Sequence, residues 1–453
     1  MSEIKVKVEQ KPPQRVGVKL GISYAEDPTL TEQLDKLNGE VVGISSSAKI
    51  AAASASKEAI RKAIADRGGE IDDDTPLSEY DAAVWSIKTS GERIPGKHRV
   101  RFFDYDGTIL KTVYTDGGAV EAPAVPDHER LLFQEWNNDF DNITDDLDVG
   151  AIYTTKSGKC EFDVWINNQV FNDLRLPRTV YMRFRLDSGN IVIDWGDGVV
   201  ETLSTIGTVQ TAHTYASTGK YMITVAASTG TLNLVSNAFS SSQSTRQGYT
   251  DQYIQEMRLT NVVGTGYNTL SGTQCCKFIS LDKKCVSFRS AAFQLLYGLI
   301  HLNIPRNFVS KADENNMFRD TPKLKTVTLP MSATALSNSA FVDSGVMDVV
   351  IPYEVTQLIG TFLNTNGVTR IEKLTIPSKV TSIGDNFFTM SNQRGASLRT
   401  LVMRPVAPPT ITTKSFSTDG SLKEIIVPKG CGEAYKSATN WSYYADIIRE
   451  EEI

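Results

Sequence analysis

The sequence has little of the material from which catalytic and metal sites are usually built. Its 453 residues include only four histidines and five cysteines. The histidines are spread too widely for a catalytic triad or a metal cluster, and Cys275, Cys276 and Cys285 have no histidine at zinc-finger spacing, so buried thiols are the favoured interpretation. Glycine-rich phosphate loops are also missing, because Gly117-Gly118 lies between predicted strands and not ahead of a helix. The sequence therefore predicts no enzyme, no cofactor and no metal site.

Long apolar runs and an excess of basic charge are missing as well. No run of about 18 apolar residues occurs that would suggest a membrane span. The first thirty residues mix five Lys and Arg residues with single valines and lack the apolar run of a secretory signal, which predicts maturation in a cytosol. The formal net charge is −6 and the pI is about 5.5. We therefore expect neither nucleic acid nor membrane insertion among the interactions of the chain.

The length predicts three or four domains, and the last of them carries a repeat. Six short apolar strands, each ending on a proline, return every 22 to 27 residues. They are His301–Pro305, Thr326–Pro330, Val349–Pro352, Lys373–Pro377, Leu401–Pro405 and Ile425–Pro428. This period is typical of leucine-rich repeats, in which one unit cannot bury its own apolar face and neighbours must stack into a continuous core. Met257–Leu259 and Phe278–Leu281 extend the period backwards.

Many of these units place an aromatic residue after the strand, where it can fill the interior between coils. Examples are Phe318, Phe341, Phe387 and Phe416. The pattern resembles the BspA-like leucine-rich repeat, which implies a solenoid over residues 231–453 and roles in adhesion and in contact with protein or glycan. The tail, Glu433–Glu452, resembles the short helices that shield the last coil of such arrays.

Residues 96–155 predict a small β module. Arg99–Phe103 alternates, Asp106-Gly107 is a hairpin signal, and an apolar strand returns from Ile109. The later order of a double glycine, Phe133 with Trp136, and a closing Ala-Ile-Tyr resembles the Listeria-Bacteroides repeat. That resemblance implies a β-grasp-like module of the kind found in bacterial and phage surface proteins.

Residues 156–230 contain a Trp-Gly-Asp-Gly turn at 195–198, followed by His-Thr-Tyr at 213–215 and Gly-Lys-Tyr at 219–221. Together these resemble a PKD-type immunoglobulin-like sandwich. Asp194, Asp197 and Glu201 can also be interpreted as a calcium site, since short-spaced oxygen ligands suit that ion. A structural turn is favoured. The acidic run from 139 to 148 is expected to form solvated turns.

The first 95 residues predict a helical region. Alanine and serine dominate from Ser45 to Arg67, and a second helix is expected after Thr75-Pro76. This two-helix pattern resembles a segment near the N-termini of phage tail and fibre proteins, which implies attachment to a virion.

One enzyme class can be weighed against this. Phe102–Ile109 places an apolar strand before Asp104-Tyr-Asp106-Gly-Thr, which resembles the nucleophile motif of haloacid-dehalogenase-like phosphatases. The resemblance implies that Asp104 attacks phosphorus, that Asp106 is the general acid and that both hold magnesium. Such an enzyme needs a strand-helix sheet behind the motif, whereas hairpin turns and prolines follow here. A plain turn at Asp106-Gly107 is favoured.

The sequence thus predicts a linear, mainly β multidomain protein in which two small modules act as spacers and the solenoid is outermost. Its predicted parts are a helical N-terminal attachment and oligomerisation region (1–95), a β-grasp-like module (96–155), a PKD-like sandwich (156–230) and a leucine-rich-repeat solenoid with a C-terminal cap (231–453). Five tyrosines of the last part can stack on sugars, although packing within or between coils is favoured. They are Tyr267, Tyr297, Tyr353, Tyr443 and Tyr444.

The predicted function is that of a non-enzymatic structural component of a phage particle, such as a tail or head fibre. The solenoid would present an adhesive surface to a host protein or glycan. Residues 1–95 would contact other virion proteins and hold a homo-oligomer, and the location would be the virion, assembled in the host bacterial cytoplasm. The alternative is a bacterial cell-surface adhesin of the BspA-like type, against which the missing secretion and anchoring signals count.

Overall fold

The computed structural model describes residues 97–453, apart from short gaps. The gaps are residues 168–169, 172–173, 176, 241–252, 286, 309–314, 335, 337–338, 361–362, 366–370, 372, 391–397 and 417–421. The described residues belong to one compact unit, 93–453. The helical region predicted for residues 1–95 lies outside them. Within them the chain is mainly β, as predicted, and helix is confined to α4 (Gly432–Ser437) and a 3-10 helix η2 (Trp441–Ile447).

The C-terminal part is a parallel β solenoid, as the repeat predicts. Successive coils pair through two parallel ladders of four strands each. The first contains β14 (Ile254–Leu259), β16 (Phe278–Leu281), β17 (His301–Asn303) and β18 (Thr326–Thr328); the second contains β21 (Lys373–Ile376), β24 (Thr400–Met403), β26 (Glu424–Pro428) and β27 (Ile448–Glu451). Shorter strands lie elsewhere on the coils: β15 (Val262–Gly264), β19 (Gln357–Leu358), β20 (Leu363–Thr365), β22 (Ser382–Ile383), β23 (Phe388–Met390) and β25 (Thr410–Ile411). Because side chains alternate along a strand, one apolar face of every coil enters a shared core.

One of the six predicted strands, Val349–Pro352, does not form. Val349 and Ile351 are nevertheless buried in the core, so this coil keeps its packing without ladder hydrogen bonds. Immediately before them, Asp348 forms an ion pair with Arg101 of another sheet at 2.9 Å. This coil therefore joins the core through its apolar residues and a second sheet through Asp348.

Aromatic side chains stack between the coils, as predicted. The rings of Phe293 and Phe318 lie 5.5 Å apart and nearly parallel, and those of Phe318 and Phe341 lie 5.3 Å apart in the same orientation. Phe387 and Phe416 are also buried. Each ring touches the equivalent ring of a neighbouring coil, so the stack couples coils that are far apart in sequence.

Replacing Phe318 with leucine is expected to lower the free energy of unfolding by about 1 kcal/mol, because aromatic pairs contribute roughly that much beyond their burial and the volume change is small. Urea denaturation measures the change. Phe308, which is buried but lies 6.0 Å from a single ring partner, Phe288, offers a matched Phe→Leu control with a smaller effect. Equal losses in the two variants would contradict the role of the stack.

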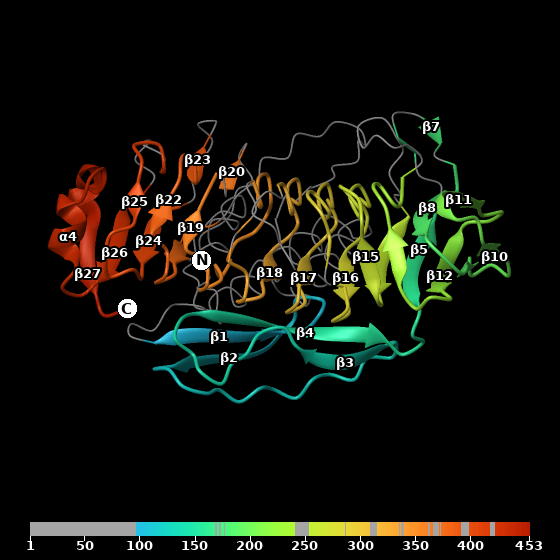
Figure 1. Ribbon diagram of the computed structural model, residues 1–453, viewed down its shortest axis with the longest axis horizontal. Coiled ribbons are helices and arrows are strands. Elements are labelled where there is room, and N and C mark those ends of the chain that lie inside the picture. The colour runs from blue at the N-terminus through green and yellow to red at the C-terminus, as the bar shows by residue number, and fades with distance from the viewer. Residues whose placement is uncertain are drawn as a thin grey trace, which may run out of the picture. The chain divides into compact units, whose positions relative to one another are not determined.

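A two-sheet sandwich precedes the solenoid and is continuous with it (Figure 1). Its strands are β5 (Cys160–Ile166), β8 (Thr179–Leu186), β9 (Ile191–Asp194), β10 (Val200–Leu203), β11 (Gly207–Thr214), β12 (Gly219–Ala227) and β13 (Leu232–Leu234), with a small hairpin of β6 (Val170–Phe171) and β7 (Leu174–Arg175). One sheet runs β10-β9-β12-β5 and continues into β14, and the other runs β11-β8-β13 and continues into β15. A single apolar cluster consequently extends from Cys160 to Ile448.

The third element is a four-stranded mixed sheet, called here the small sheet. It is formed by β1 (His98–Phe103), β2 (Ile109–Thr115), β3 (Leu131–Trp136) and β4 (Leu147–Thr155) in the order β2-β1-β4-β3, with β1 and β4 parallel. It lies along the first ladder of the solenoid, where β4 contacts β14, β16, β17 and β18 (Figure 1). The prediction that this module is a spacer in a linear chain is therefore wrong.

Two adjacent asparagines fix the small sheet to the solenoid. Asn137 donates through Nδ2 to the carbonyl of Ile304 at 2.8 Å and accepts at Oδ1 from the Gly150 amide at 2.7 Å. Asn138 donates to the carbonyl of Leu329 at 2.9 Å. Both side chains are buried. Because buried amides lose free energy when left unpaired, these contacts specify one docking position.

Two residues of the acidic run from 139 to 148 are buried in ion pairs, one within the small sheet and one between it and the solenoid. Asp148 is buried and accepts two hydrogen bonds from Arg101, at 2.8 and 2.7 Å. Asp145 is also buried and pairs with Arg404 of the second ladder at 2.6 Å. The expectation of solvated turns is wrong for these two residues, because arginines supplied by other strands compensate their charges.

The C-terminal end of the solenoid is closed by α4 and η2, whereas the end of the predicted helical cap forms β27 and continues the second ladder. Tyr435 donates from its hydroxyl to the carbonyl of Pro405 at 2.7 Å, and Trp441 donates from its indole nitrogen to the carbonyl of Pro409 at 2.7 Å. Both side chains are fully buried. They cover the apolar face of the last coil.

Candidate functional site

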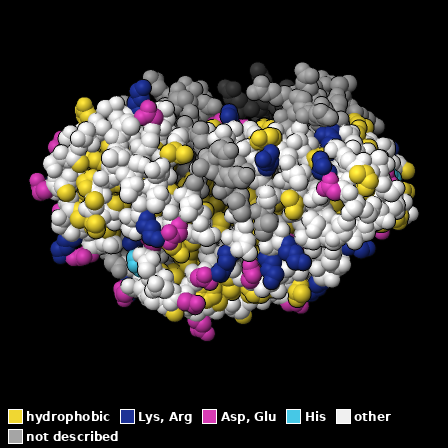
Figure 2. Space-filling view, in the orientation of Figure 1, with side chains coloured by type: hydrophobic (Ala, Val, Ile, Leu, Met, Phe, Trp, Pro, Cys, Tyr) yellow, Lys and Arg dark blue, Asp and Glu magenta, His cyan; other side chains and the backbone are white. Residues whose placement is uncertain are grey.

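Charged side chains of both signs are interspersed along the border between the small sheet and the solenoid (Figure 2). At one point on this border the surface contains a cleft of about 310 Å³, called here the junction cleft. Its lining comes from the small sheet and the segments around it, from β5 and from β14. The residues that matter below are Tyr105, His128, Arg130, Asp163 and Arg258.

Strand alternation explains how the charges of the cleft come together. Glu161 and Asp163 are two residues apart on β5, and Glu256 and Arg258 are two residues apart on β14, so each pair lies on one face of its strand. The antiparallel register places Arg258 opposite Glu161 and Glu256 opposite Asp163. Arg130, just before β3, completes the cluster.

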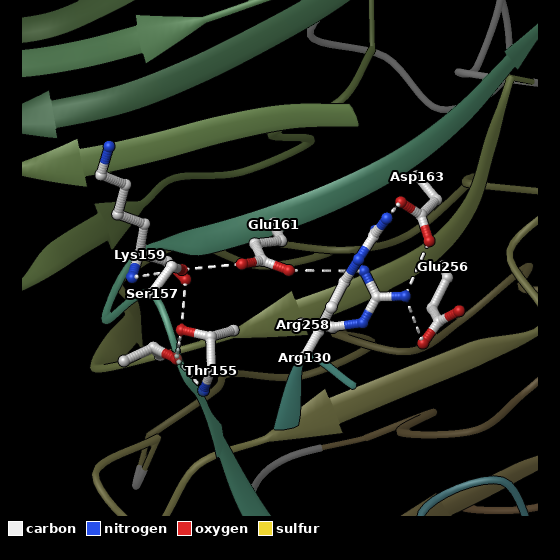
Figure 3. Close-up of polar contacts among 9 residues, drawn as sticks. Arg130, Thr155, Ser157, Lys159, Glu161, Asp163, Glu256 and Arg258 are labelled. Carbon is white, nitrogen blue, oxygen red and sulfur yellow. Dashed lines mark hydrogen bonds and ion pairs between the residues drawn. The ribbon is translucent and has the colours of Figure 1, made fainter. Parts of the chain in front are cut away.

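The two arginines share one carboxylate (Figure 3). Arg130 donates through Nη1 to Oδ1 of Asp163 at 2.9 Å, and Arg258 donates through Nη2 to Oδ2 of Asp163 at 2.7 Å. Arg258 also pairs with Glu256 at 2.9 Å and, more distantly, with Glu161 at 3.7 Å. This network joins the small sheet, the sandwich and the first coil of the solenoid.

Burial changes the ionisation of the cluster. Burial raises the pKa of the Glu256 carboxyl above its ordinary value, and Arg258 only partly offsets this. Burial alone would lower the pKa of the Arg258 guanidinium, but its carboxylate partners, above all Asp163, raise it. Burial also raises the pKa of Tyr105 to about 12. The cleft therefore presents a permanently charged guanidinium and a neutral phenol at ordinary pH.

Asp104 and Asp106 do not form a phosphatase site. The carboxylate of Asp104 is buried and accepts hydrogen bonds from the Tyr153 hydroxyl at 2.7 Å and from the Tyr105 amide at 2.8 Å, and it pairs with His128 at 3.0 Å. Asp106 accepts from the Thr108 amide at 2.9 Å, which closes the predicted turn. A hairpin strand, β2, follows the motif where the phosphatase needs a helix. That resemblance is overturned.

We expect the full chain to show no magnesium-dependent turnover of a generic phosphomonoester such as p-nitrophenyl phosphate. Asp104→Asn is expected to leave that background unchanged and to lower the free energy of unfolding by about 1 kcal/mol, because it weakens a charged hydrogen-bond acceptor. Absorbance at the nitrophenolate band and urea denaturation test the two expectations. Turnover that disappears in Asp104→Asn would revive the phosphatase.

The carboxylates weighed for calcium serve the sandwich. Asp194 accepts from the Gly196 amide at 2.9 Å, and Asp197 pairs with His213 at 2.7 Å. Glu201 accepts from the Thr211 hydroxyl at 2.8 Å. These contacts agree with the favoured structural turn.

Over residues 97–453, gaps excepted, one group of side chains has metal-like spacing: His98, Asp145 and Asp146. Arg404 pairs with both of these aspartates, at 2.6 and 3.3 Å, so a cation already lies beside the group. Cys276 and Cys285 are buried, as predicted, whereas Cys275, also expected to be buried, is half-buried.

The five tyrosines considered for sugar stacking differ in their exposure to solvent. Tyr267, Tyr297 and Tyr443 are exposed by 56%, 39% and 77%, so part of each ring is open to solvent. Tyr353 and Tyr444 are half-buried. Tyr267 packs against the Arg289 guanidinium, 5.3 Å from its ring centre.

The junction cleft was missed at the sequence level. The charged pairs at 161 and 163 and at 256 and 258 alternate with apolar residues, so their outward orientation could have been recognised. Their convergence depends on the pairing of β5 with β14, which no local pattern indicates.

Comparison with known proteins identifies the repeat. The family model described as "BspA type Leucine rich repeat region" matches in six copies, over residues 265–395 and 312–444. A leucine-rich repeat protein from Bacteroides ovatus, known from a crystal structure, is 13% identical over 44% of this chain and 70% of its own, with a TM-score of 0.26. No curated protein matches the chain. In the described part of the chain, no helix has the length and apolar character needed to span a membrane.

Proposed function

We propose that the chain is a non-enzymatic adhesin whose leucine-rich-repeat solenoid binds a surface protein or glycan. The observation that carries the proposal is the single apolar cluster from Cys160 to Ile448, which joins the sandwich and the coils through one continuous core. The BspA-type repeats between residues 265 and 444 support it. A wide rigid face suits binding through many modest contacts, and several copies on one surface add avidity.

The exposed tyrosines Tyr267, Tyr297 and Tyr443 are the proposed contact residues of the solenoid. Each presents an amphipathic ring that can pack on a sugar or on a protein side chain. We further propose that residues 96–155 are a Listeria-Bacteroides-like module, supported by the mixed order of the small sheet, and that residues 156–230 are PKD-like, supported by their two sheets.

Two carriers are considered. A bacterial cell surface is favoured, because the repeats are of the BspA type. A phage particle is the second candidate and depends on the two-helix pattern between residues 59 and 87, which resembles phage tail and fibre proteins. In that case residues 1–95 would hold a homo-oligomer and contact other virion proteins.

Immunogold electron microscopy with antibodies raised against the full chain separates the carriers. Labelling of intact bacterial cells that encode the chain supports the adhesin, whereas labelling of projections on purified phage particles supports the second candidate. Absence of label from both would overturn the proposal.

A further inference from the structure

We propose that the junction cleft binds a neutral sugar ring with vicinal hydroxyl groups. This goes beyond the adhesive role of the solenoid exterior, because the cleft lies where the small sheet, the sandwich and the first coil meet. Its volume of about 310 Å³ lies at the lower end of the range of small-molecule pockets, which suits a single ring with some water.

A buried guanidinium nitrogen provides the first argument. The side chain of Arg258 is 8% exposed, and its Nη1 has no hydrogen-bond partner among the residues that the structure describes. The ion pair from Nη1 to Glu161 spans 3.7 Å, which is too long for a hydrogen bond. A buried donor without an acceptor costs free energy, and Arg258 lines the cleft. The Nη1 atom is itself buried, so a ligand oxygen in the cleft would satisfy it after a local shift of the Arg258 side chain.

The arrangement of donors and acceptors provides the second argument. Arg130 and Arg258 flank the Asp163 carboxylate, so donor, acceptor and donor follow one another across the network (Figure 3). A hydroxyl group donates and accepts at once, and two neighbouring hydroxyls match a planar carboxylate or guanidinium. A vicinal diol can thus form hydrogen bonds with these donors and this acceptor without breaking the ion pairs between them.

The charged groups in and around the cleft favour a neutral ligand over an anion or a cation. Two carboxylates that line the cleft, Glu129 and Asp163, and two beside it, Glu161 and Glu256, outnumber the guanidinium groups of Arg130 and Arg258, so an anion would be repelled by the surplus. A compact cation would instead be placed beside two arginines. A neutral polyol is repelled neither by the carboxylates nor by the arginines.

An aromatic wall provides the third argument. The Tyr105 ring lines the cleft and is held edge-to-face by His128, with ring centres 5.0 Å apart. The neighbouring Tyr153 packs on both rings and donates its hydroxyl to Asp104. A fixed phenol ring offers an apolar surface to the C–H groups of a sugar at little cost in side-chain entropy.

Saturation-transfer NMR on the full chain tests the proposal. The probes are methyl α-D-glucopyranoside, methyl α-D-mannopyranoside and methyl β-D-galactopyranoside, with inorganic phosphate and methylammonium titrated in parallel. We expect transfer to at least one glycoside, with a Kd of about 1 mM, and no competition by either ion. No transfer to any glycoside, or displacement by phosphate or methylammonium, would overturn the proposal. Because free sugars are used, the result does not depend on whether cells or phage particles carry the chain.

A pair of matched arginine variants assigns the binding to the cleft. Arg130 and Arg306 are both 37% exposed and each pairs with one aspartate, but only Arg130 lines the cleft. Arg130→Gln is expected to weaken binding at least about tenfold, whereas Arg306→Gln should leave it unchanged. If Arg130→Gln does not unfold cooperatively, Glu129→Gln, an exposed residue of the same cleft, replaces it with an expected loss of severalfold. Equal binding by the cleft variant and Arg306→Gln rules the cleft out.

Discussion

Replacing Gly150 with alanine is expected to loosen the small sheet from the solenoid and to lower the free energy of unfolding by about 3 kcal/mol or more. A Cβ atom at this position would lie 2.3 Å from the Thr328 hydroxyl oxygen and 2.4 Å from Cγ of Asn303. Neither side chain can yield easily. Asn303 donates to the carbonyls of Asp104 and Ala151, both at 3.1 Å, and accepts from Thr328 at 2.8 Å.

Gly384→Ala is the matched control, because a Cβ there meets nothing closer than a carbonyl oxygen at 3.4 Å. Hydrogen exchange of residues 98–155 should accelerate in Gly150→Ala and remain unchanged in Gly384→Ala. Urea denaturation gives the free energies. Protection of the small sheet equal to that of the unmodified chain would show that the docking described for Gly150 does not hold the two elements together.

A second large effect is expected from pH, through His301. This imidazole is fully buried beneath the small sheet, stacks on Phe103 with ring centres 5.2 Å apart, and hydrogen-bonds Asn303 at 2.6 Å and Thr326 at 2.5 Å. Burial lowers its pKa from 6.5 to about 4. The other charged groups that act on it are Asp106, Asp148 and Arg101.

The sign follows from proton binding. Between pH 6.5 and about 4 the unfolded chain binds a proton at His301 and the folded chain does not, so acidification favours unfolding. The stability is complete above pH 6.5, and about 3 kcal/mol of it is lost as the pH falls to about 4. Carboxylates in ion pairs add a loss of the same sign.

A variant isolates the contribution of the imidazole. His301→Gln keeps a donor and an acceptor but does not titrate, so its urea-derived free energies should fall less steeply between pH 7 and pH 4. The difference between the two slopes is the quantity of interest, because the carboxylate contribution is common to both proteins. Parallel curves would mean that the neutral imidazole is not required for docking.

The coils could be predicted from the sequence because their signal is local and repeated. An apolar strand, a proline and a later aromatic recur in each unit, and five of the six predicted strands form. Val349–Pro352 was the exception, because this segment is buried in the core without forming a strand. The aromatic plugs followed from the same periodicity.

The docking of the small sheet could not be predicted in this way. Asn137 bonds a carbonyl 167 residues away, and the buried pair of Asp145 and Arg404 forms only when the small sheet lies on the solenoid. An asparagine or an aspartate in a loop carries no mark of such a partner. The junction cleft was missed for the same reason, whereas the turn at Asp106-Gly107, a local feature, was predicted correctly.

The pairing of β5 with β14 gives the array an asymmetry. Repeat arrays unravel from their termini, where a coil has a neighbour on one side only. Here the first coil continues a sheet that the sandwich already provides, whereas the last coil is protected only by α4, η2 and β27. Thermal fraying and proteolytic trimming of the array should therefore begin at its last coil and proceed inward, leaving the amino-terminal coils intact longest.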